Sequence, residues 1–110
     1  MRSLFRFYDE NEVEEMCGFI LDKRRCVQLK NVHPEPTEGF EIDPEDTLRY
    51  LDRIKGIWHT HPNEPAVLSG HDKLCMEMWP DIPHYIIGSD GIRKYVVKDG
   101  AVVNANYTPR

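Results

Sequence analysis

Residues 57–72 read IWHTHPNEPAVLSGHD, and this stretch decides how the rest of the chain is interpreted. The apolar pair Ile57 and Trp58 opens a short run that Pro62 ends, so residues 57–61 are predicted to form a buried strand. Side chains alternate along a strand, so His59 and His61 point to one face while Trp58 packs on the other. Two imidazoles on one face at a strand's end are suited to bind a metal ion.

A third ligand has to come from elsewhere in the chain. A loop over residues 62–68 leads to a helix that begins at Ser69, and Asp72 lies one turn into it. Three protein ligands would leave a tetrahedral zinc ion one open position for water, and a nearby carboxylate would carry the proton. A second interpretation stays open, because Ser69 and Asp72 have the spacing of a helix capping box and the histidines could be hydrogen-bonded at a sheet edge.

Outside this stretch, strand and helix signals alternate early and strands follow one another late. Strands are predicted at residues 17–21, 26–30, 57–61, 84–88, 92–97 and 101–103, and helices at 44–55 and 69–78. Asp43 is predicted to cap the first helix and Gly56 to end it. Its apolar residues Leu48, Leu51 and Ile54 would form one stripe on the sheet. The predicted fold class is α/β, with a mixed β-sheet flanked by helices.

Composition limits the class of protein. The chain has 110 residues, 40% hydrophobic and 30% charged, which is enough for one compact domain. A net charge of -5 counts against a nucleic-acid binder, which usually carries a basic face. No apolar run approaches the roughly 20 residues that span a bilayer, and no export signal is visible, so a cytoplasmic protein is expected. The 3 cysteines include no CxxC pair and are expected to be free thiols.

The spacing of these residues resembles a known signature. His59-Thr-His-Pro62, six further residues, and Ser69-Gly-His-Asp72 are similar to the HxHP…SxxD motif of the JAMM/MPN+ (JAB) zinc metallopeptidases. Upstream, Glu15-Met-Cys-Gly18 resembles the ExCG stretch that carries the catalytic glutamate of that family, and residues 31–44 resemble the run before its central helix. The resemblance covers nearly the whole chain. It implies a JAB/MPN-like (cytidine-deaminase-like) sandwich in which residues 1–110 form a single domain.

The resemblance also implies a role for each matching residue. His59, His61 and Asp72 would hold Zn²⁺. Glu15 would be the general acid/base that acts on the activated water, and Ser69 would donate a hydrogen bond to the developing oxyanion. The reaction would be hydrolysis of a peptide or isopeptide bond in a protein or peptide substrate, without a covalent enzyme intermediate.

Some nearby residues have simpler interpretations. Glu15 stands among glutamates that fit a solvated surface, and its register with Cys17 and Gly18 singles it out. Cys17 is expected to be a small buried strand residue rather than a nucleophile, and His71 is expected to point away from the metal. The chain before Glu15 is short, so the first helix usual in the family is expected to be clipped or irregular, with Leu4 and its aromatic neighbours covering the core.

Several biological roles fit such a minimal domain. The short span from Met78 to His84 leaves no room for the long insertion with which eukaryotic deubiquitinating relatives hold ubiquitin. We favour the peptidase part of a bacteriophage tail-tip assembly protein, incorporated in a virion tail, because the chain is compact and its last residues, 108–110, suit a domain boundary. The alternatives are a bacterial protease that processes ubiquitin-like or sulfur-carrier proteins, and a catalytically inactive scaffold of the same fold. A zinc nucleoside deaminase would need an HxE motif followed by PCxxC, and this chain has no CxxC.

Overall fold

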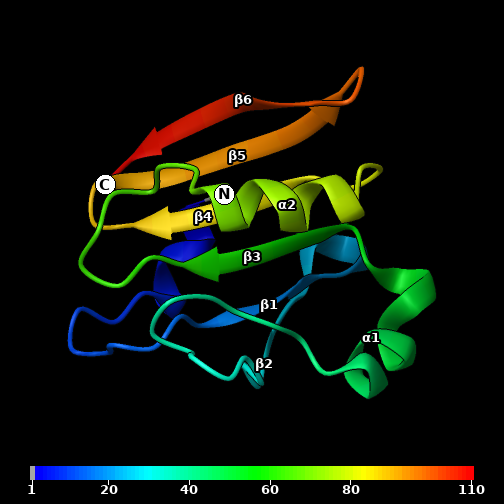
Figure 1. Cartoon of the computed structure of the whole chain (residues 1–110), viewed down its shortest axis with the longest axis horizontal. Coiled ribbons are helices and arrows are strands. Elements are labelled where there is room, and N and C mark those ends of the chain that lie inside the picture. Colours follow the sequence, from blue (N-terminus) through cyan, green and yellow to red (C-terminus); the bar gives the residue numbers. More distant parts are fainter. Residues whose placement is uncertain (1) are drawn as a thin grey trace.

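The run that carries the two histidines folds as a central strand of a mixed six-stranded β-sheet (Figure 1). The computed structural model describes residues 2–110. Its strands are β1 (Cys17–Ile20), β2 (Cys26–Leu29), β3 (Gly56–Thr60), β4 (His84–Gly88), β5 (Gly91–Lys98) and β6 (Ala101–Pro109). They lie in the order β2-β1-β3-β4-β5-β6. The pair β3 and β4 is parallel and the other neighbours are antiparallel, which confirms the predicted α/β class with a mixed sheet.

Helix α2 (Gly70–Met78) connects the two parallel strands and lies on one face of the sheet (Figure 1). Parallel strands need such a crossover because the chain must return to the end from which it started. The helix begins as predicted, with Ser69 and Asp72 forming a capping box, and it ends before Pro80. Its residue Met76 is buried in one cluster with Ile86 of β4.

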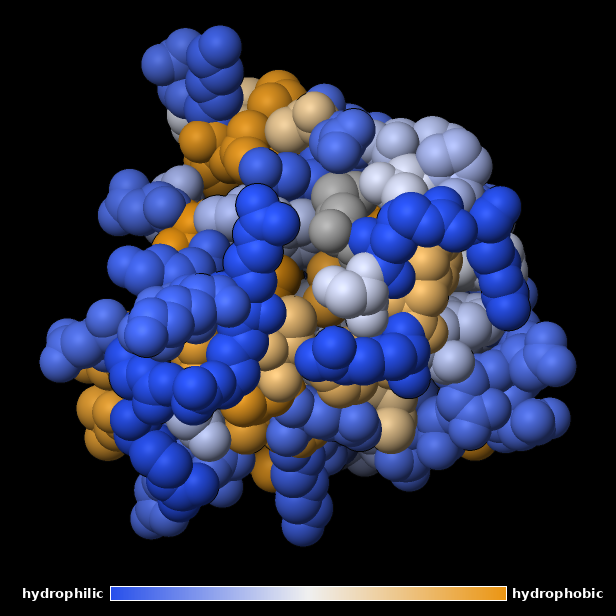
Figure 2. Space-filling model, turned by 180° about the vertical axis from the view of Figure 1, so that it is seen from behind, coloured by the Kyte–Doolittle hydropathy of each residue, from blue (hydrophilic) through white to orange (hydrophobic). Residues whose placement is uncertain are grey.

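The opposite face of the sheet is covered by the 3-10 helix η1 (Arg2–Phe7). Leu4 is buried in one cluster with Trp58 of β3, and the ring of Phe7 stacks on Trp58 with 4.2 Å between centroids. The irregular N-terminal segment therefore covers the core as expected, and Trp58 packs on the face away from the histidines. Seen from this side, the surface is mostly hydrophilic, with separate apolar patches (Figure 2).

The first predicted helix differs from the expectation. It is α1 (Pro44–Tyr50) followed by the 3-10 turn η3 (Leu51–Arg53). The predicted stripe is wrong, because Leu48 and Leu51 are 70% and 50% exposed and only Ile54 is buried. The α-helix ends at Tyr50, which is too early for the three-residue spacing to keep these residues on one helical face. In addition, α1 lies beyond the strand ends, so the sheet does not cover it (Figure 1). No helix within residues 2–110 is long and apolar enough to cross a membrane.

The remaining strands form hairpins as predicted. In the turn between β5 and β6, Asp99 and Gly100 have φ angles of 53° and 81°, as a type I′ turn requires. Strand β6 is longer than the predicted residues 101–103, because it pairs with the whole of β5, with one irregularity between Lys94 and Tyr95.

Candidate metal centre

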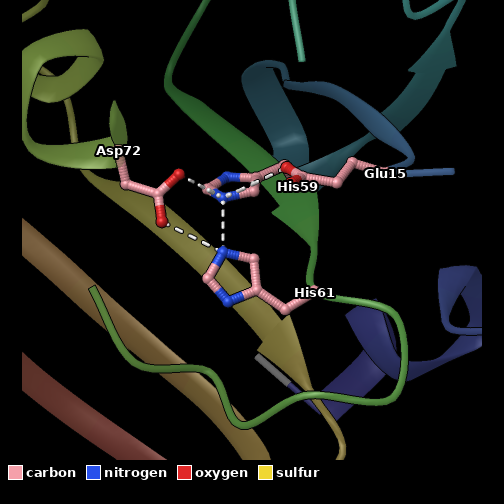
Figure 3. A group of neighbouring side chains, drawn as sticks. All are labelled: Glu15, His59, His61 and Asp72. Atoms are coloured by element: carbon pink, nitrogen blue, oxygen red, sulfur yellow. Dashed lines mark hydrogen bonds and ion pairs between the residues drawn. The ribbon is translucent and has the colours of Figure 1, made fainter. Parts of the chain in front are cut away.

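Four polar side chains converge beside the C-terminal end of β3 (Figure 3). They are Glu15, His59, His61 and Asp72, and one ligand atom from each lies within 4.8 Å of those of the others. They come from the segment before β1, from β3 and its end, and from the first turn of α2. All four are buried, none more than 8% exposed, which is unusual for charged groups unless they are paired. The structure thus brings together four of the five site residues predicted from the sequence.

Strand β3 and its continuation present the two imidazoles. Antiparallel pairing sets Cys17 of β1 opposite His59, which brings the segment before β1 to the same end of the sheet. The backbone N–H of His61 donates to the carbonyl of Ile87 at 2.8 Å, so the chain stays against β4 just past the end of β3. The Nε2 atoms of His59 and His61 are 3.3 Å apart. Phe40 stacks on His59 with 4.5 Å between ring centroids, which limits the rotation of this imidazole.

The carboxylate of Asp72 faces both imidazoles. Its Oδ1 lies 3.0 Å from Nε2 of His59, and its Oδ2 lies 3.0 Å from Nε2 of His61. Oδ2 also accepts the backbone N–H of Ser69 at 3.2 Å, so the capping box and the contact with the histidines exist together. Burial alone would raise the pKa of Asp72, but the hydrogen bonds and charges of His59 and His61 outweigh it and hold that pKa well below its usual range. Asp72 is therefore a charged carboxylate at neutral pH.

Glu15 approaches the cluster from the opposite side. Its backbone N–H donates to the carbonyl of Pro36 at 2.7 Å, and its carbonyl accepts from Nδ2 of Asn31 at 2.9 Å, so the segment before β1 is held in place. The side-chain oxygen Oε1 lies 4.0 Å from Nε2 of His59 and is buried without a hydrogen-bond partner. Burial is the main cause that raises the pKa of Glu15 from 4.5 to about 7.

The protonation pattern of His61 shows that the cluster suits a cation. Its Nδ1 lies 3.1 Å from the carbonyl of Pro65, and a carbonyl only accepts, so Nδ1 carries a proton. The lone pair on Nε2 of neutral His61 then faces Asp72 and the second imidazole. Lone pairs and a carboxylate around one point need a positive charge among them, either a proton or a metal ion. Two imidazole nitrogens with carboxylate oxygens form a typical donor set for zinc, so the residues present fit that ion.

The two histidine pKa values follow from the same contacts. Burial lowers the pKa of His59, which favours the neutral imidazole that a metal ion requires. Burial would also lower the pKa of His61, but the hydrogen bond and charge of Asp72 outweigh it and raise that pKa. The raised pKa means that His61 binds a proton more tightly than a free histidine does.

The other residues singled out in the sequence lie around this cluster. Ser69 is exposed at the start of α2, and its hydroxyl oxygen accepts the Asp72 N–H at 3.1 Å, which leaves the hydroxyl proton for another acceptor. His71 lies outside the cluster, with its ring edge-on to His33. Cys17 is fully buried, and burial raises the pKa of its thiol to about 12, so it is poorly suited to act as a nucleophile.

Asn31 supports the site, a role that the sequence did not predict. Its Nδ2 donates to the carbonyls of Glu15 and Gly39 at 2.9 Å each, and its Oδ1 accepts two backbone N–H groups at 3.0 Å. It therefore fastens the loop over residues 31–41 to the backbone of Glu15. An asparagine at a strand end in a proline-rich loop often bonds to nearby backbone, but the link to a residue so far away in sequence is not readable from that pattern.

An apolar groove of about 700 Å³ lies beside the cluster, between α1 and α2. The sheet contributes Phe19 and Ile57 to its lining, and the two helices contribute Leu48 and Met78, which are 70% and 79% exposed. Phe40 belongs both to the groove and to the stack on the imidazole of His59. The groove therefore touches the cluster through Phe40, and none of the four clustered residues lines it.

Comparison with known proteins gives the same family for most of the chain. The model for prokaryotic homologs of the JAB domain matches residues 1–99. A "probable TtuB-protein conjugate cleaving protease" of Thermus thermophilus is 33% identical over 86 residues, covering 72% of this chain and 57% of that protein. A desampylase of Pyrococcus furiosus is 32% identical over 93 residues, covering 74% of this chain and 65% of that protein. A desampylase of Haloferax volcanii is 29% identical over 90 residues, 70% of this chain and 64% of that protein.

The matched region spans about three fifths of the length of these relatives. The family match over residues 1–99 includes the ExCG stretch, the HxHP…SxxD spacing and the first five strands of the sheet. The family match agrees with the resemblance seen in the sequence and with the mixed sheet seen in the structure. The chain belongs to the prokaryotic homologs of the JAB domain, within the JAMM/MPN+ family.

Proposed function

We propose that this protein is a zinc-dependent hydrolase that cuts the amide bond between a ubiquitin-like modifier and the protein to which it is attached. The observation that carries the proposal is the buried convergence of Glu15, His59, His61 and Asp72, with one oxygen of Glu15 left without a hydrogen-bond partner. The names of the relatives support the type of substrate, because one cleaves a protein conjugate and two are desampylases. Cleavage of such a conjugate is hydrolysis of a peptide or isopeptide bond.

His59, His61 and Asp72 would hold the zinc ion through two nitrogens and one oxygen. Three such ligands leave the fourth tetrahedral position open, which distinguishes a catalytic from a structural zinc site. A zinc ion bound there supplies a Lewis acid and lowers the pKa of a bound water to about 7. The capping box holds Asp72, and the carbonyl of Pro65 holds His61, so both ligands are oriented before the ion binds.

Glu15 is the general acid/base in this proposal. Burial raises the pKa of Glu15 to about 7 in the metal-free chain, and a general acid/base works best with a pKa near the operating pH. Such a group takes a proton from water and returns it to the departing amine with little cost in either direction. Its oxygen Oε1 has no hydrogen-bond partner, and the bonds from Asn31 and to Pro36 hold the backbone of Glu15 beside the site.

Ser69 is proposed to stabilise the oxyanion of the substrate carbonyl. Its hydroxyl oxygen already accepts a bond from Asp72 N–H, so the hydroxyl donates its own proton outward. It lies at the N-terminus of α2, where the helix dipole also favours negative charge. A positioned donor of this kind acts on charge that develops only in the transition state.

The apolar groove is proposed to hold the modifier. Phe40 lines the groove and also stacks on the imidazole of His59. When apolar side chains of the modifier occupy the groove, the residues of its flexible tail that follow them would lie near His59. The exposed Leu48 and Met78 on either side are large apolar groups that a bound protein would cover.

The sequence is also compatible with two other roles. A bacteriophage tail-tip peptidase, which the compact chain suggested, has no support in the description of the family or in the names of the relatives. These names favour the alternative role, a protease that processes ubiquitin-like proteins. An inactive scaffold of the same fold would have no need for four buried polar groups around one point, because their burial costs stability without an ion.

The test is cleavage of a defined conjugate. The zinc-loaded protein is incubated with a ubiquitin-like protein joined by its C-terminal glycine to a lysine side chain of a second protein, and both products are weighed by mass spectrometry. We expect the intact modifier and the unmodified acceptor, with cleavage stopped by a chelator and restored by zinc.

Two matched variants test the role of the residues. Glu15→Gln keeps the shape of the side chain and removes its proton-carrying oxygen, so cleavage should fall by at least about 100-fold. Glu14→Gln makes the same change on an exposed neighbour and should leave the rate unaltered. Wild-type cleavage by Glu15→Gln, or cleavage that is insensitive to the chelator, would show that the proposed mechanism is wrong.

A further inference from the structure

One peptide unit connects the metal centre to a carboxylate outside it. The Nδ1–H of His61 donates to the carbonyl of Pro65 at 3.1 Å, and the N–H of Ala66 donates to Oδ1 of Asp90 at 2.8 Å. That carbonyl and that N–H belong to the same planar trans peptide and point in opposite directions. His61 and Asp90 therefore hold the two ends of a single peptide dipole.

We propose that Asp90 is a positioning residue for His61, acting through the Pro65–Ala66 peptide. A carboxylate that accepts the N–H polarises the peptide and makes its carbonyl a stronger acceptor. A carbonyl that accepts Nδ1–H fixes the tautomer and the ring orientation of a histidine and makes its Nε2 a better ligand. The inference rests on the proposed function in one respect, because it takes His61 as a zinc ligand.

The peptide has little freedom to move. The hydroxyl of Tyr95 donates to the carbonyl of Ala66 at 3.2 Å, and the N–H of Ser89 donates to the carbonyl of Glu64 at 2.8 Å, so contacts with β5 and the β4–β5 turn flank the unit. Gly88 allows this close approach, because a Cβ there would collide with the backbone N of Ala66 and lie 2.6 Å from the carbonyl carbon of Pro65. A change at Asp90 therefore reaches His61 through a short, constrained path.

Asp90 is itself held as a charged group. Its Oδ2 accepts from the guanidinium of Arg93 at 2.7 Å. Burial would raise the pKa of Asp90, but the bonds from Ala66 and Arg93 outweigh burial and lower it. Asp90 is not one of the four clustered residues, so its substitution leaves every proposed zinc ligand in place.

The experiment measures zinc affinity by competition with a chelator in three variants of the full chain. In Asp90→Ala the peptide loses its acceptor, and we expect the zinc dissociation constant to rise by about 10- to 100-fold, as for other outer partners of metal-binding histidines. In Asp90→Asn the amide oxygen can still accept, so the rise should be smaller. The matched control is Asp46→Ala, because Asp46 pairs with Arg49 on α1 at the same three-residue spacing as Asp90 with Arg93. The zinc affinity of Asp46→Ala should equal that of the wild type.

A second readout separates positioning from general stability. Nitrogen-15 NMR of the histidine rings reports the proton on Nδ1 of His61, and we expect this proton to exchange with solvent faster in Asp90→Ala than in the wild type. A merely structural Asp90 would lower the melting temperature and leave both the exchange rate and the affinity per folded molecule unchanged.

Each outcome decides the matter. Zinc affinity in folded Asp90→Ala within about twofold of the wild type, or an equal loss in Asp46→Ala, overturns the inference. If Asp90→Ala does not fold, Asp90→Asn decides, and an unchanged affinity together with an unchanged His61 proton overturns it. A wild-type chain that binds no zinc overturns the proposed function instead. The inference then stands or falls on the exchange of the Nδ1 proton in the metal-free protein.

Discussion

The burial of the Glu15 carboxylate predicts that the metal-free protein gains stability when this residue is replaced by glutamine. Glu15 is 8% exposed, and its Oε1 has no hydrogen-bond partner. Glutamine has nearly the same shape and removes the charge, while the unsatisfied oxygen stays in both proteins and cancels in the comparison. The gain therefore measures the cost of burying the ionised form.

The size and the sign follow from the shifted pKa. Burial raises the pKa of Glu15 from 4.5 to about 7, so the folded protein binds this proton more tightly than the unfolded chain does. The free energy of unfolding of the wild type then falls as the pH rises through this window, and the loss is complete above it. At about 1.4 kcal/mol per pH unit the full cost is about 3 kcal/mol.

The assay is urea unfolding with a chelator present, at one pH below and one pH above the window from 4.5 to about 7. Glu15→Gln should be more stable than the wild type at the higher pH, with most of the gain gone at the lower pH. Glu14→Gln, on the exposed neighbour, should change stability by less than about 0.5 kcal/mol at both. Added zinc should shrink the gain, because a nearby cation favours the carboxylate. A Glu15→Gln variant that is no more stable at the higher pH, or equally favoured at both, would refute the reasoning.

Three further predictions concern the ligands and the core. Asp72→Ala should weaken zinc binding by at least about 100-fold, as measured by competition with a chelator. Ser69→Ala should keep its zinc affinity in the same assay, and urea unfolding should show the loss of about 1 kcal/mol of helix capping. Phe40→Ala should lower the free energy of unfolding by about 3 kcal/mol, because it empties space beside His59, and a loss below about 1 kcal/mol would contradict this. Gly18→Ala should prevent stable pairing of β1 with β2, since a Cβ would collide with the carbonyl of Val27, and a wild-type melting temperature would show otherwise.

The secondary structure could be predicted from the sequence only in part. The hairpins were predictable, because turn residues such as Asp99-Gly100 impose their geometry locally. The length and packing of the first helix were not predictable, since the three-residue spacing of its apolar residues cannot reveal that the α-helix ends at Tyr50. Helix length depends on whether a sheet lies beneath the helix to bury its residues, and α1 has no buried residue.

The sequence by itself determined the parts of the site that depend on local periodicity. His59 and His61 share a face because side chains alternate along a strand, and Ser69 caps the helix that carries Asp72 because the capping box closes within one turn. These relations span only a few residues, so backbone geometry is enough to predict them.

Only the tertiary structure decided which distant groups complete the site. Glu15 meets His59 because β1 pairs with β3 in the register that sets Cys17 opposite His59. Asp90 reaches His61 because the loop after β3 folds back onto the β4–β5 turn, where Gly88 leaves room for it. Strand register and loop packing are set by the burial of the whole core, so no short stretch of sequence encodes them.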